Sequence, residues 1–279
     1  MNGSLKSVSR RSMLFGMAGF GVAIALNACS NSSPSAADKG TPLKVGGNIG
    51  NVPWEFRDAE GNVVGFEVDL INLIGERLER PIEFIDMPFT ELFPAVLSGR
   101  IDLAISSITI TAERMETLDF AQPYYDSDQS LLTLSSSSMK SLAEMKGKVV
   151  GVDSGSTGDT WVQEHADEYQ FASIKRFEGL ANAMLALKAG ECDGYISDIP
   201  ALQYYAKSHS EVTVVERIPT GEQYSMMFAK GNPLRDQVNE LITAFKEAGV
   251  VAEIHETWFG KAPEANTSTV AIATVPQLP

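Results

Sequence analysis

The chain contains one segment twice, in closely similar form. "AVLSGRIDLAISS" (Ala95 to Ser107) returns 91 residues later as "ALKAGECDGYISD" (Ala186 to Asp198), with identical residues at five of thirteen positions. Each copy predicts the end of a helix, a glycine in the left-handed conformation that caps it, an aspartate in the turn and a short buried strand. Helix–glycine–strand units are common, so chance is the alternative explanation. We favour two lobes of similar build.

Strands and helices alternate along the folded part of the chain. The 279 residues, 44% of them apolar, suffice for two packed domains. "PLKVGGN" predicts a strand and "FEVDLINLIGERL" a helix, followed by "IEFIDM", "FTELFPAVLSG" and "IDLAISS". Such alternation predicts a mainly parallel sheet with helices on its faces. Ligands bind beyond the carboxyl ends of such strands, so we expect Ser106, Ser107 and Thr109 at a cleft.

The connection between the lobes is expected to be a hinge. No long linker interrupts residues 42–260, so the chain must cross between lobes by strands. We expect two crossing strands, "QSLLTLS" (129–135) outward and "QYSMMFA" (223–229) on the return. This assigns residues 42–130 and 227–260 to lobe 1 and residues 131–226 to lobe 2. A hinge beside a polar cleft indicates a protein that closes around a ligand.

Residues 1–28 are typical of a secretory signal peptide. Basic residues precede an apolar stretch from Met13 to Leu26, which is too short and glycine-rich for a convincing membrane span. Within it, Ser9-Arg10-Arg11 resembles a twin-arginine export signal. Export would place the mature protein outside the cytoplasm.

The end of this signal resembles the lipobox of bacterial lipoproteins. Leu26-Asn27-Ala28-Cys29 fits that pattern, in which the cysteine becomes the new N-terminus and carries lipid chains such as palmitate. A plain cleaved signal is the alternative. We expect lipidation of Cys29, a tether over residues 29–41 and a membrane-anchored protein on the periplasmic side or outer face of the cell membrane.

Charge and cysteine content exclude some partners. With Cys29 acylated, Cys192 is left single and no intramolecular disulfide can form. Cleavage deletes Lys6, Arg10 and Arg11 and no acid, so the net charge changes from -14 to -17. Such an acidic surface argues against binding of nucleic acid. We also expect a monomer, and a flexible tail over residues 261–279.

Two local patterns mark helix starts, and the second of them suits an anion. Arg114 falls near the start of a short helix with Thr111 as its N-cap. The turn from Ser154 to Gly158 precedes the helix in "GDTWVQEHADEY", and its small residues present backbone N–H groups suited to an anion.

Other chemistries lack a motif. His165, His209 and His255 are dispersed and show no metal-site spacing. The glycine patterns lack the lysine and hydroxyl that end a P-loop, and "GVDSGSTG" lacks the spacing of a nucleophile elbow. We expect no metal, no cofactor and no catalytic residue.

Several motifs together resemble a known family. "VPWEFRDAEGNVVGFEVDL", "AISSITITAERMETLDFAQPYY", "KVVGVDSGSTGD", "GYISDIPAL" and "IHETWFG" are similar to segments of the polar amino-acid-binding proteins of bacterial ABC importers, family 3 of the extracellular solute-binding proteins. The resemblance covers about residues 42–260. It implies a two-lobed periplasmic-binding-protein fold of type II that closes on one amino acid and delivers it to the transmembrane permease subunits.

The resemblance also implies a set of ligand-binding residues. Arg114 matches the arginine that holds the ligand α-carboxylate, with Ser107 and Thr109 as its hydroxyl and backbone partners. Asp198 matches the acid that binds the α-ammonium group, and Thr157 matches a second-lobe contribution to the carboxylate site. A guanidinium on one lobe and a carboxylate on the other would both be satisfied by a zwitterion.

Side-chain specificity is expected to come from a second group of residues. Asn48 and Asn51 stand where the family commonly has an acid and an aromatic residue, while Phe89 matches an aromatic residue that packs on the ligand. Asp153 falls where the family varies with ligand and would repel an acidic side chain. We therefore favour a basic or neutral polar amino acid. Trp54 is predicted in the core of lobe 1 rather than in the pocket wall.

Two other functions use the same fold. Periplasmic dehydratases act on carboxylated rings, and Asp153 with a raised pKa could serve as a general acid. Turnover of prephenate or arogenate would distinguish such an enzyme from a carrier. The third possibility is a sensing module that passes ligand occupancy to a receptor.

Overall fold

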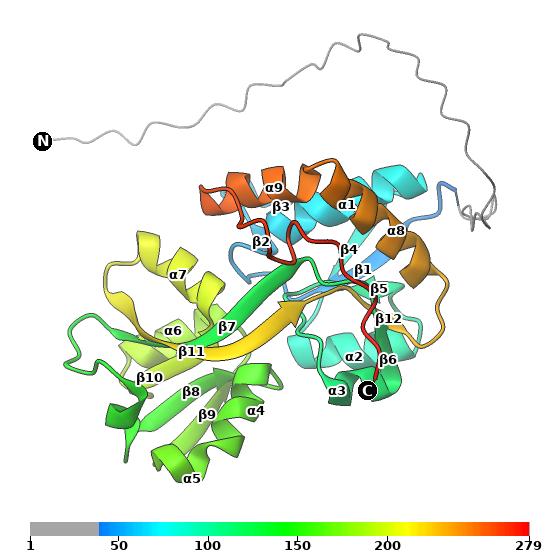
Figure 1. Cartoon of the computed structure of the whole chain (residues 1–279). Helices are drawn as coiled ribbons and strands as arrows, with labels where there is room; N and C mark the ends of the chain where they lie inside the picture. The colour runs from blue at the N-terminus through cyan, green and yellow to red at the C-terminus, as the bar shows by residue number, and fades with distance from the viewer. Residues whose placement is uncertain (1–38, 279) are drawn as a thin grey trace, which may run out of the picture. The chain divides into compact units, whose positions relative to one another are not determined.

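The computed structural model of the protein describes residues 39–278 (Figure 1). The predicted signal peptide, the export motif and the lipidation site at Cys29 lie outside the described residues. Within residues 39–278, no helix combines the length and apolar character needed to span a membrane.

The first sheet has five strands. Their order is β4 (Ile82–Asp86), β1 (Leu43–Gly47), β5 (Leu103–Ala104), β12 (Met227–Ala229) and β6 (Leu118–Phe120). Strand β1 pairs in parallel with both β4 and β5, whereas β12 is antiparallel to β5 and β6. A small ribbon of β2 (Phe56–Arg57) and β3 (Val63–Val64) precedes the first helix.

Helices cover this sheet through two apolar cores. They are α1 (Phe66–Leu78), α2 (Phe89–Leu97), α3 (Ala112–Thr117), α8 (Leu234–Glu247) and α9 (Val250–Phe259). The larger core joins α1, α8 and α9 to β1, and the smaller core joins α2 to residues around β5 and β12. Helix α1 has the predicted bounds, and Trp54 is fully buried in the larger core, as predicted.

The second sheet also has five strands. Their order is β11 (Val212–Tyr224), β7 (Tyr125–Leu134), β10 (Gly194–Asp198), β8 (Val149–Asp153) and β9 (Ser173–Phe177). Strand β8 is parallel to β9 and β10, and β7 is antiparallel to β10 and β11. The helical segments of this lobe are η1 (Leu142–Met145), α4 (Thr157–Glu164), α5 (Ala166–Tyr169), α6 (Leu180–Lys188) and α7 (Ile199–Ser208).

Two long strands connect the lobes, as the sequence analysis predicted in outline (Figure 1). Strands β7 and β11 pair from Tyr125 opposite Tyr224 to Leu134 opposite Val212. The return crossing therefore ends at Tyr224, and the predicted crossing strand 223–229 is split, since Met227–Ala229 belongs to the first sheet. Likewise, β7 joins the second sheet from Tyr125, earlier than the predicted boundary at residue 130. Strand alternation alone does not reveal such continuous pairing along a hinge.

The two similar sequence segments occupy equivalent places in the two lobes. Helix α2 leads through Gly99 (φ 71°) to β5, and α6 leads through Gly190 (φ 72°) to β10. Asp102 Oδ2 accepts a hydrogen bond from Lys44 N at 2.9 Å, and Asp193 Oδ2 accepts one from Val149 N at 2.8 Å. Each aspartate thus ties its turn to the neighbouring parallel strand. This equivalence supports the prediction of two lobes of similar build.

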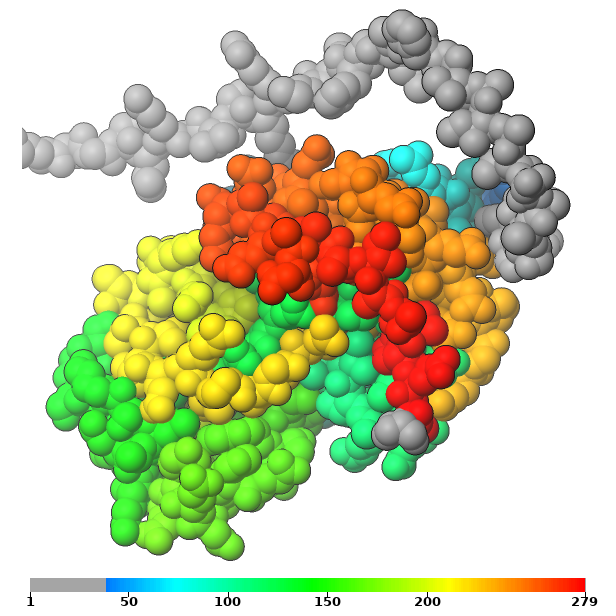
Figure 2. Space-filling model, in the orientation of Figure 1, coloured from blue at the N-terminus to red at the C-terminus, as the bar shows by residue number. Residues whose placement is uncertain are grey.

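The C-terminal segment differs from the predicted flexible tail. Ser268 and Thr269 are buried, and Ser268 N donates to Asp126 Oδ2 at 2.7 Å. Lys246 Nζ donates to Ala271 O at 2.9 Å. Figure 2 shows this segment, in red, lying on the surface beside β11, in yellow. Apolar periodicity could not predict this attachment, because it depends on hydrogen bonds of Ser268 with Asp126 and Gln223.

Candidate ligand-binding site

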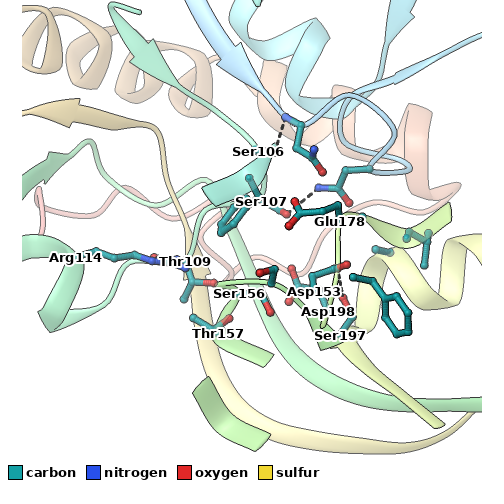
Figure 3. A pocket seen from close by; sticks show the side chains of 18 residues that line it. Ser106, Ser107, Thr109, Arg114, Asp153, Ser156, Thr157, Glu178, Ser197 and Asp198 are labelled. Atoms are coloured by element: carbon teal, nitrogen blue, oxygen red, sulfur yellow. Dashed lines mark hydrogen bonds between the residues drawn. The ribbon is translucent and has the colours of Figure 1, made fainter. Parts of the chain in front are cut away.

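A cavity lies between the lobes, where polar residues follow β5, β8 and β10 (Figure 3). All nine residues that the sequence analysis assigned to ligand binding line this cavity. They are Asn48, Asn51, Phe89, Ser107, Thr109, Arg114, Asp153, Thr157 and Asp198. Arg114 and Asp198, which belong to different lobes, therefore face one common space.

Arg114 contributes the positive charge of this cavity from lobe 1. Thr111 caps α3, as predicted, and its hydroxyl accepts from Arg114 N at 3.1 Å. The guanidinium lies over the rings of Phe89 and Phe93, at 5.5 and 5.1 Å from their centroids, while Nη1 donates to Thr109 O at 2.7 Å. Burial lowers the pKa of Arg114 to about 10, opposed by nearby acids, so the group stays charged at neutral pH.

The lobes touch each other across the cavity. Arg114 Nη2 donates to Gly155 O of lobe 2 at 3.4 Å. A Cβ atom added to Gly155, which has a φ of 71°, would approach Thr90 Cγ2 of lobe 1 to 3.0 Å. A glycine therefore suits both the backbone conformation and the close approach. The structure shows a closed arrangement of the cleft.

Asp153 and Asp198 contribute acidic groups from lobe 2. Asp198 Oδ1 accepts from Gln129 Nε2 at 2.6 Å, and Asp153 Oδ2 accepts from Tyr195 Oη at 2.5 Å. Burial, followed by the charge of Glu222, raises the pKa of Asp198 to about 8, and burial raises the pKa of Asp153 to about 6. Hydrogen bonds from Tyr195, Ser197 and the backbone of Gly179 oppose this rise at Asp153. The cavity thus holds carboxyl groups that a cation would stabilise in their ionised form.

The hydroxyl side of the cavity is arranged by the loop residues of lobe 1. Asn51 Nδ2 donates to Ser107 Oγ at 3.0 Å, and Asn48 N donates to Ser106 Oγ at 3.1 Å. Across the cavity, Ser156 caps α4 and accepts from Asp159 N at 3.1 Å. The helix therefore begins at Thr157, within the predicted small-residue turn.

Three further lining residues, Ser106, Ser154 and Ser156, lie in the strand end and the turn that the sequence indicated. Six lining residues were not predicted. They are Phe177, Glu178, Gly179, Leu180, Ser197 and Ala201. The most consequential is Glu178, an additional acid that follows β9 directly and points toward Ser107 in Figure 3. The strand-end argument would have found it if "SIKRF" had been recognised as a strand.

Glu222 was also missed, and it joins the two lobes at the hinge. This buried carboxylate on β11 accepts from Thr109 Oγ1 of lobe 1 at 2.7 Å and from Thr157 Oγ1 of lobe 2 at 2.9 Å. Gln129 Nε2 donates to it as well, at 2.9 Å. In this arrangement the two threonine hydroxyl protons are directed to Glu222 rather than toward the cavity.

The side chains that commonly bind metals are not grouped in the described part of the chain. Among residues 39–278, no group of three or more histidine, cysteine, aspartate or glutamate side chains is placed to hold a metal ion. The three histidines make other contacts; His165 and His209 bond to the carbonyls of Trp161 and Tyr205, and His255 bonds to Lys261 O.

The protein has two sheet-based lobes, a hinge of two strands and a cavity lined by opposite charges. These features define a class of ligand-binding proteins that close around a small molecule. The sequence profile of the bacterial extracellular solute-binding proteins, family 3, matches residues 43–261. The chain belongs to this family.

Known proteins resemble the chain over most of its length. A probable histidine-binding protein of Neisseria gonorrhoeae is 31% identical over 250 residues, covering 86% of this chain and 92% of the relative. An ancestral arginine-binding protein, solved bound to arginine, is 34% identical with a TM-score of 0.74, covering 78% of this chain and 98% of the other.

A third relative is the arginine-, lysine-, histidine-binding protein ArtJ from the thermophilic bacterium Geobacillus stearothermophilus. It is 32% identical with a TM-score of 0.74, covering 81% of this chain and 98% of the other. These similarities confirm the predicted family and the predicted two-lobed periplasmic-binding-protein fold.

Proposed function

We propose that the protein binds a polar L-amino acid, preferably a basic one, and delivers it to an ABC permease. The observation that carries this proposal is the charge of the cavity. Arg114 faces three acids of lobe 2, namely Asp153, Glu178 and Asp198. A ligand with one carboxylate and two cationic groups would balance these charges better than a neutral or acidic amino acid.

The α-groups of the ligand would bridge the lobes. Its carboxylate would pair with the Arg114 guanidinium, whose planar N–H groups suit two parallel hydrogen bonds. Its α-ammonium group would pair with Asp198. The cationic side chain would lie near Glu178 and Asp153. The names of the three relatives, which refer to histidine, arginine and lysine, support the same ligand class.

Ligand binding would stabilise the closed form through the hinge strands β7 and β11. Closing the cavity without a ligand is costly because its charged groups are removed from water without partners. A zwitterion supplies partners on both sides and shifts the equilibrium toward closure. We propose that the closed monomer is the form recognised by the permease.

We further propose that the protein acts outside the cytoplasm, attached to the cell membrane through lipid on Cys29. The lipobox-like sequence and the family of extracellular proteins support this assignment. Labelling with a palmitate analogue would test it: wild-type protein should carry the label, and Cys29→Ala should lose both the label and the membrane fraction. Equal labelling of the two would refute lipidation at this residue.

A thermal-shift screen with the twenty amino acids tests the ligand class. Arginine, lysine and histidine should give the largest stabilisation, since a ligand at a hundred times its Kd adds about 2.7 kcal/mol. Aspartate and glutamate should give none. The largest shift from an acidic amino acid, or no shift at all, would contradict the proposal. Conversion of prephenate or arogenate by the same sample would instead support the enzyme alternative.

A further inference from the structure

Two carboxyl groups lie together in lobe 1, behind the wall of the cavity. Glu55 precedes β2 and Glu67 is the second residue of α1, and both side chains are fully buried. Burial raises the pKa of both groups, and for Glu55 the nearby charge of Glu67 raises it further. Both residues fall in the segment "VPWEFRDAEGNVVGFEVDL", and neither lines the cavity.

Each carboxyl group holds one residue of the turn after β5. Ser106 Oγ donates to Glu55 Oε1 at 2.5 Å, and Ser107 N donates to Glu67 Oε1 at 2.8 Å. Tyr124 Oη donates to the same oxygen of Glu67 at 2.5 Å. Both serines line the cavity (Figure 3). The two acids therefore support the hydroxyl wall from behind.

The backbone of Ser107 needs such support. Its φ of 43° lies in the left-handed region, which residues other than glycine occupy only where their surroundings hold them. The hydrogen bond from its N–H group to Glu67 fixes this conformation, and Asn51 Nδ2 fixes its side chain. Removing the carboxylate oxygen of Glu67 would release the turn.

The other carboxyl oxygens of Glu55 and Glu67 bear on the protonation of the pair. Glu55 Oε2 and Glu67 Oε2 are buried, and no third group among residues 39–278 donates a hydrogen bond to them. In the part of the chain that the structure describes, neither acid forms an ion pair with lysine, arginine or histidine; the groups facing them are Asn51, Ser106, Ser107 and Tyr124. Burial and the two carboxylates raise the pKa of Tyr124 well above its ordinary value, so it remains a neutral donor.

Two ionised carboxylates would be poorly tolerated in this place. Each would leave a buried charge without a cation, and the two would repel each other. One proton between them removes the repulsion and one of the two buried charges, because a protonated carboxyl group donates to the neighbouring carboxylate. The pair then carries a single negative charge and accepts the bonds from Ser106, Ser107 and Tyr124.

We infer that Glu55 and Glu67 share one proton, and that this pair is the positioning element that holds Ser106 and Ser107 in the binding conformation. The part that concerns ligand binding rests on the proposed function. In this role neither glutamate contacts the ligand; both act through the two serines. Loss of the shared proton at alkaline pH would loosen the turn and weaken binding.

Isosteric variants test the shared proton without any ligand. In Glu67→Gln, the amide oxygen can still accept from Ser107 N and Tyr124 Oη, while the amide N–H replaces the shared proton toward Glu55. Glu55→Gln makes the reciprocal replacement, and Glu76→Gln, at an exposed position on α1, is the matched control. The infrared signal of a protonated carboxyl group at neutral pH should fall in both test variants and not in the control.

Stability against pH gives a second ligand-free measurement. A carboxyl pKa raised by folding adds stability that is present below the unfolded pKa and is lost as pH rises through the folded pKa. Wild type and Glu76→Gln should thus lose melting temperature as pH rises above the ordinary carboxyl range and through the raised pKa of the pair, relative to Glu55→Gln and Glu67→Gln. An unchanged infrared signal, or parallel stability profiles for all four proteins, would overturn the inference. If one test variant fails to fold, the other reports on the same proton.

Arginine affinity then tests the positioning role. Below the raised pKa of the pair, the Kd values of Glu67→Gln and the control should agree within about threefold, and above that pKa the control should bind about tenfold more weakly than the variant. Titration of the ligand and of the cavity acids affects all proteins alike. Its effect therefore cancels in the ratio of the control's Kd to the variant's Kd. A constant ratio would refute the positioning role. If wild type binds no arginine, the proposed function fails, while the ligand-free measurements still decide the shared proton.

Discussion

The two lobes share one backbone plan and differ in the charge that they present to the cavity. In lobe 1 the chain runs from α2 through Gly99 to β5, and in lobe 2 from α6 through Gly190 to β10, with an aspartate holding each turn. In lobe 1 the buried acids Glu55 and Glu67 lie behind the end of β5. Ser106 and Ser107 therefore form the surface of the cavity there. In lobe 2 the acid itself, Asp198, ends the strand. The shared plan therefore fixes where a polar group stands, and the local sequence decides its charge.

Arg114→Ala should produce the largest change, because it removes the cation of lobe 1. Two charge-assisted hydrogen bonds, each contributing about 1.5–3 kcal/mol, would be lost, so affinity for arginine should fall by at least about a hundredfold. Isothermal titration calorimetry would measure this change, with circular dichroism to verify folding. Arg100→Ala is the control, since Arg100 forms an exposed pair with Glu91 on the same lobe. Equal affinities of the two variants would remove Arg114 from the site.

Asp198→Asn should have the next largest effect, on the opposite lobe. We expect a loss of about ten- to a hundredfold in affinity, with Asp167→Asn, exposed on α5, as the control. Burial and the charge of Glu222 raise the pKa of Asp198 to about 8, and a ligand ammonium group would lower it. Wild-type affinity should therefore rise with pH up to about 8, and binding at about pH 7 should release a proton.

Calorimetry in two buffers of different ionisation enthalpy would measure this proton release. It should be close to one proton in wild type and much smaller in Asp198→Asn. Proton uptake, or an equal release by both proteins, would contradict the assignment of Asp198 as the ammonium-binding acid.

The residues at strand ends were predictable from the sequence, whereas those on the hinge and behind the site were not. Ser107 follows a recognisable strand, so the strand-end rule places it at a cleft. Asp198, which ends its strand, was assigned through the family resemblance. Glu222 lies on a strand that pairs with another over a long sequence separation, and no local pattern shows which threonines it meets. Glu55 and Glu67 lie twelve residues apart, and only folding brings them together.

Glu222→Gln should weaken the contact between the two lobes. Both threonines donate to Oε2, so a glutamine oxygen in that place can still accept from them but carries no charge, and its N–H group then faces the Gln129 donor. The interlobe bonds should therefore weaken. We expect affinity for arginine to fall about three- to tenfold, which corresponds to about one hydrogen bond. Small-angle X-ray scattering of the ligand-free protein should show a larger radius of gyration.

Glu216→Gln is the matched control for this change. Glu216 lies on the same strand but bonds to Leu142 N within lobe 2, so its loss should leave closure unaffected. If both variants scatter alike and bind alike, Glu222 does not link the lobes energetically.

Ser268→Ala should have the smallest effect, because it alters the C-terminal segment that touches both hinge strands. Asp126 of β7 accepts from Ser268 Oγ at 2.5 Å, and Gln223 Nε2 of β11 donates to the same hydroxyl at 2.8 Å. Losing these bonds should cost about 1 kcal/mol and lower the melting temperature by about 2–4 °C. Asn266→Ala, at an exposed position nearby, should leave it unchanged. Arginine affinity should change less than twofold, within about 0.4 kcal/mol, because the segment lies outside the cavity; a larger change would show that it restrains the hinge.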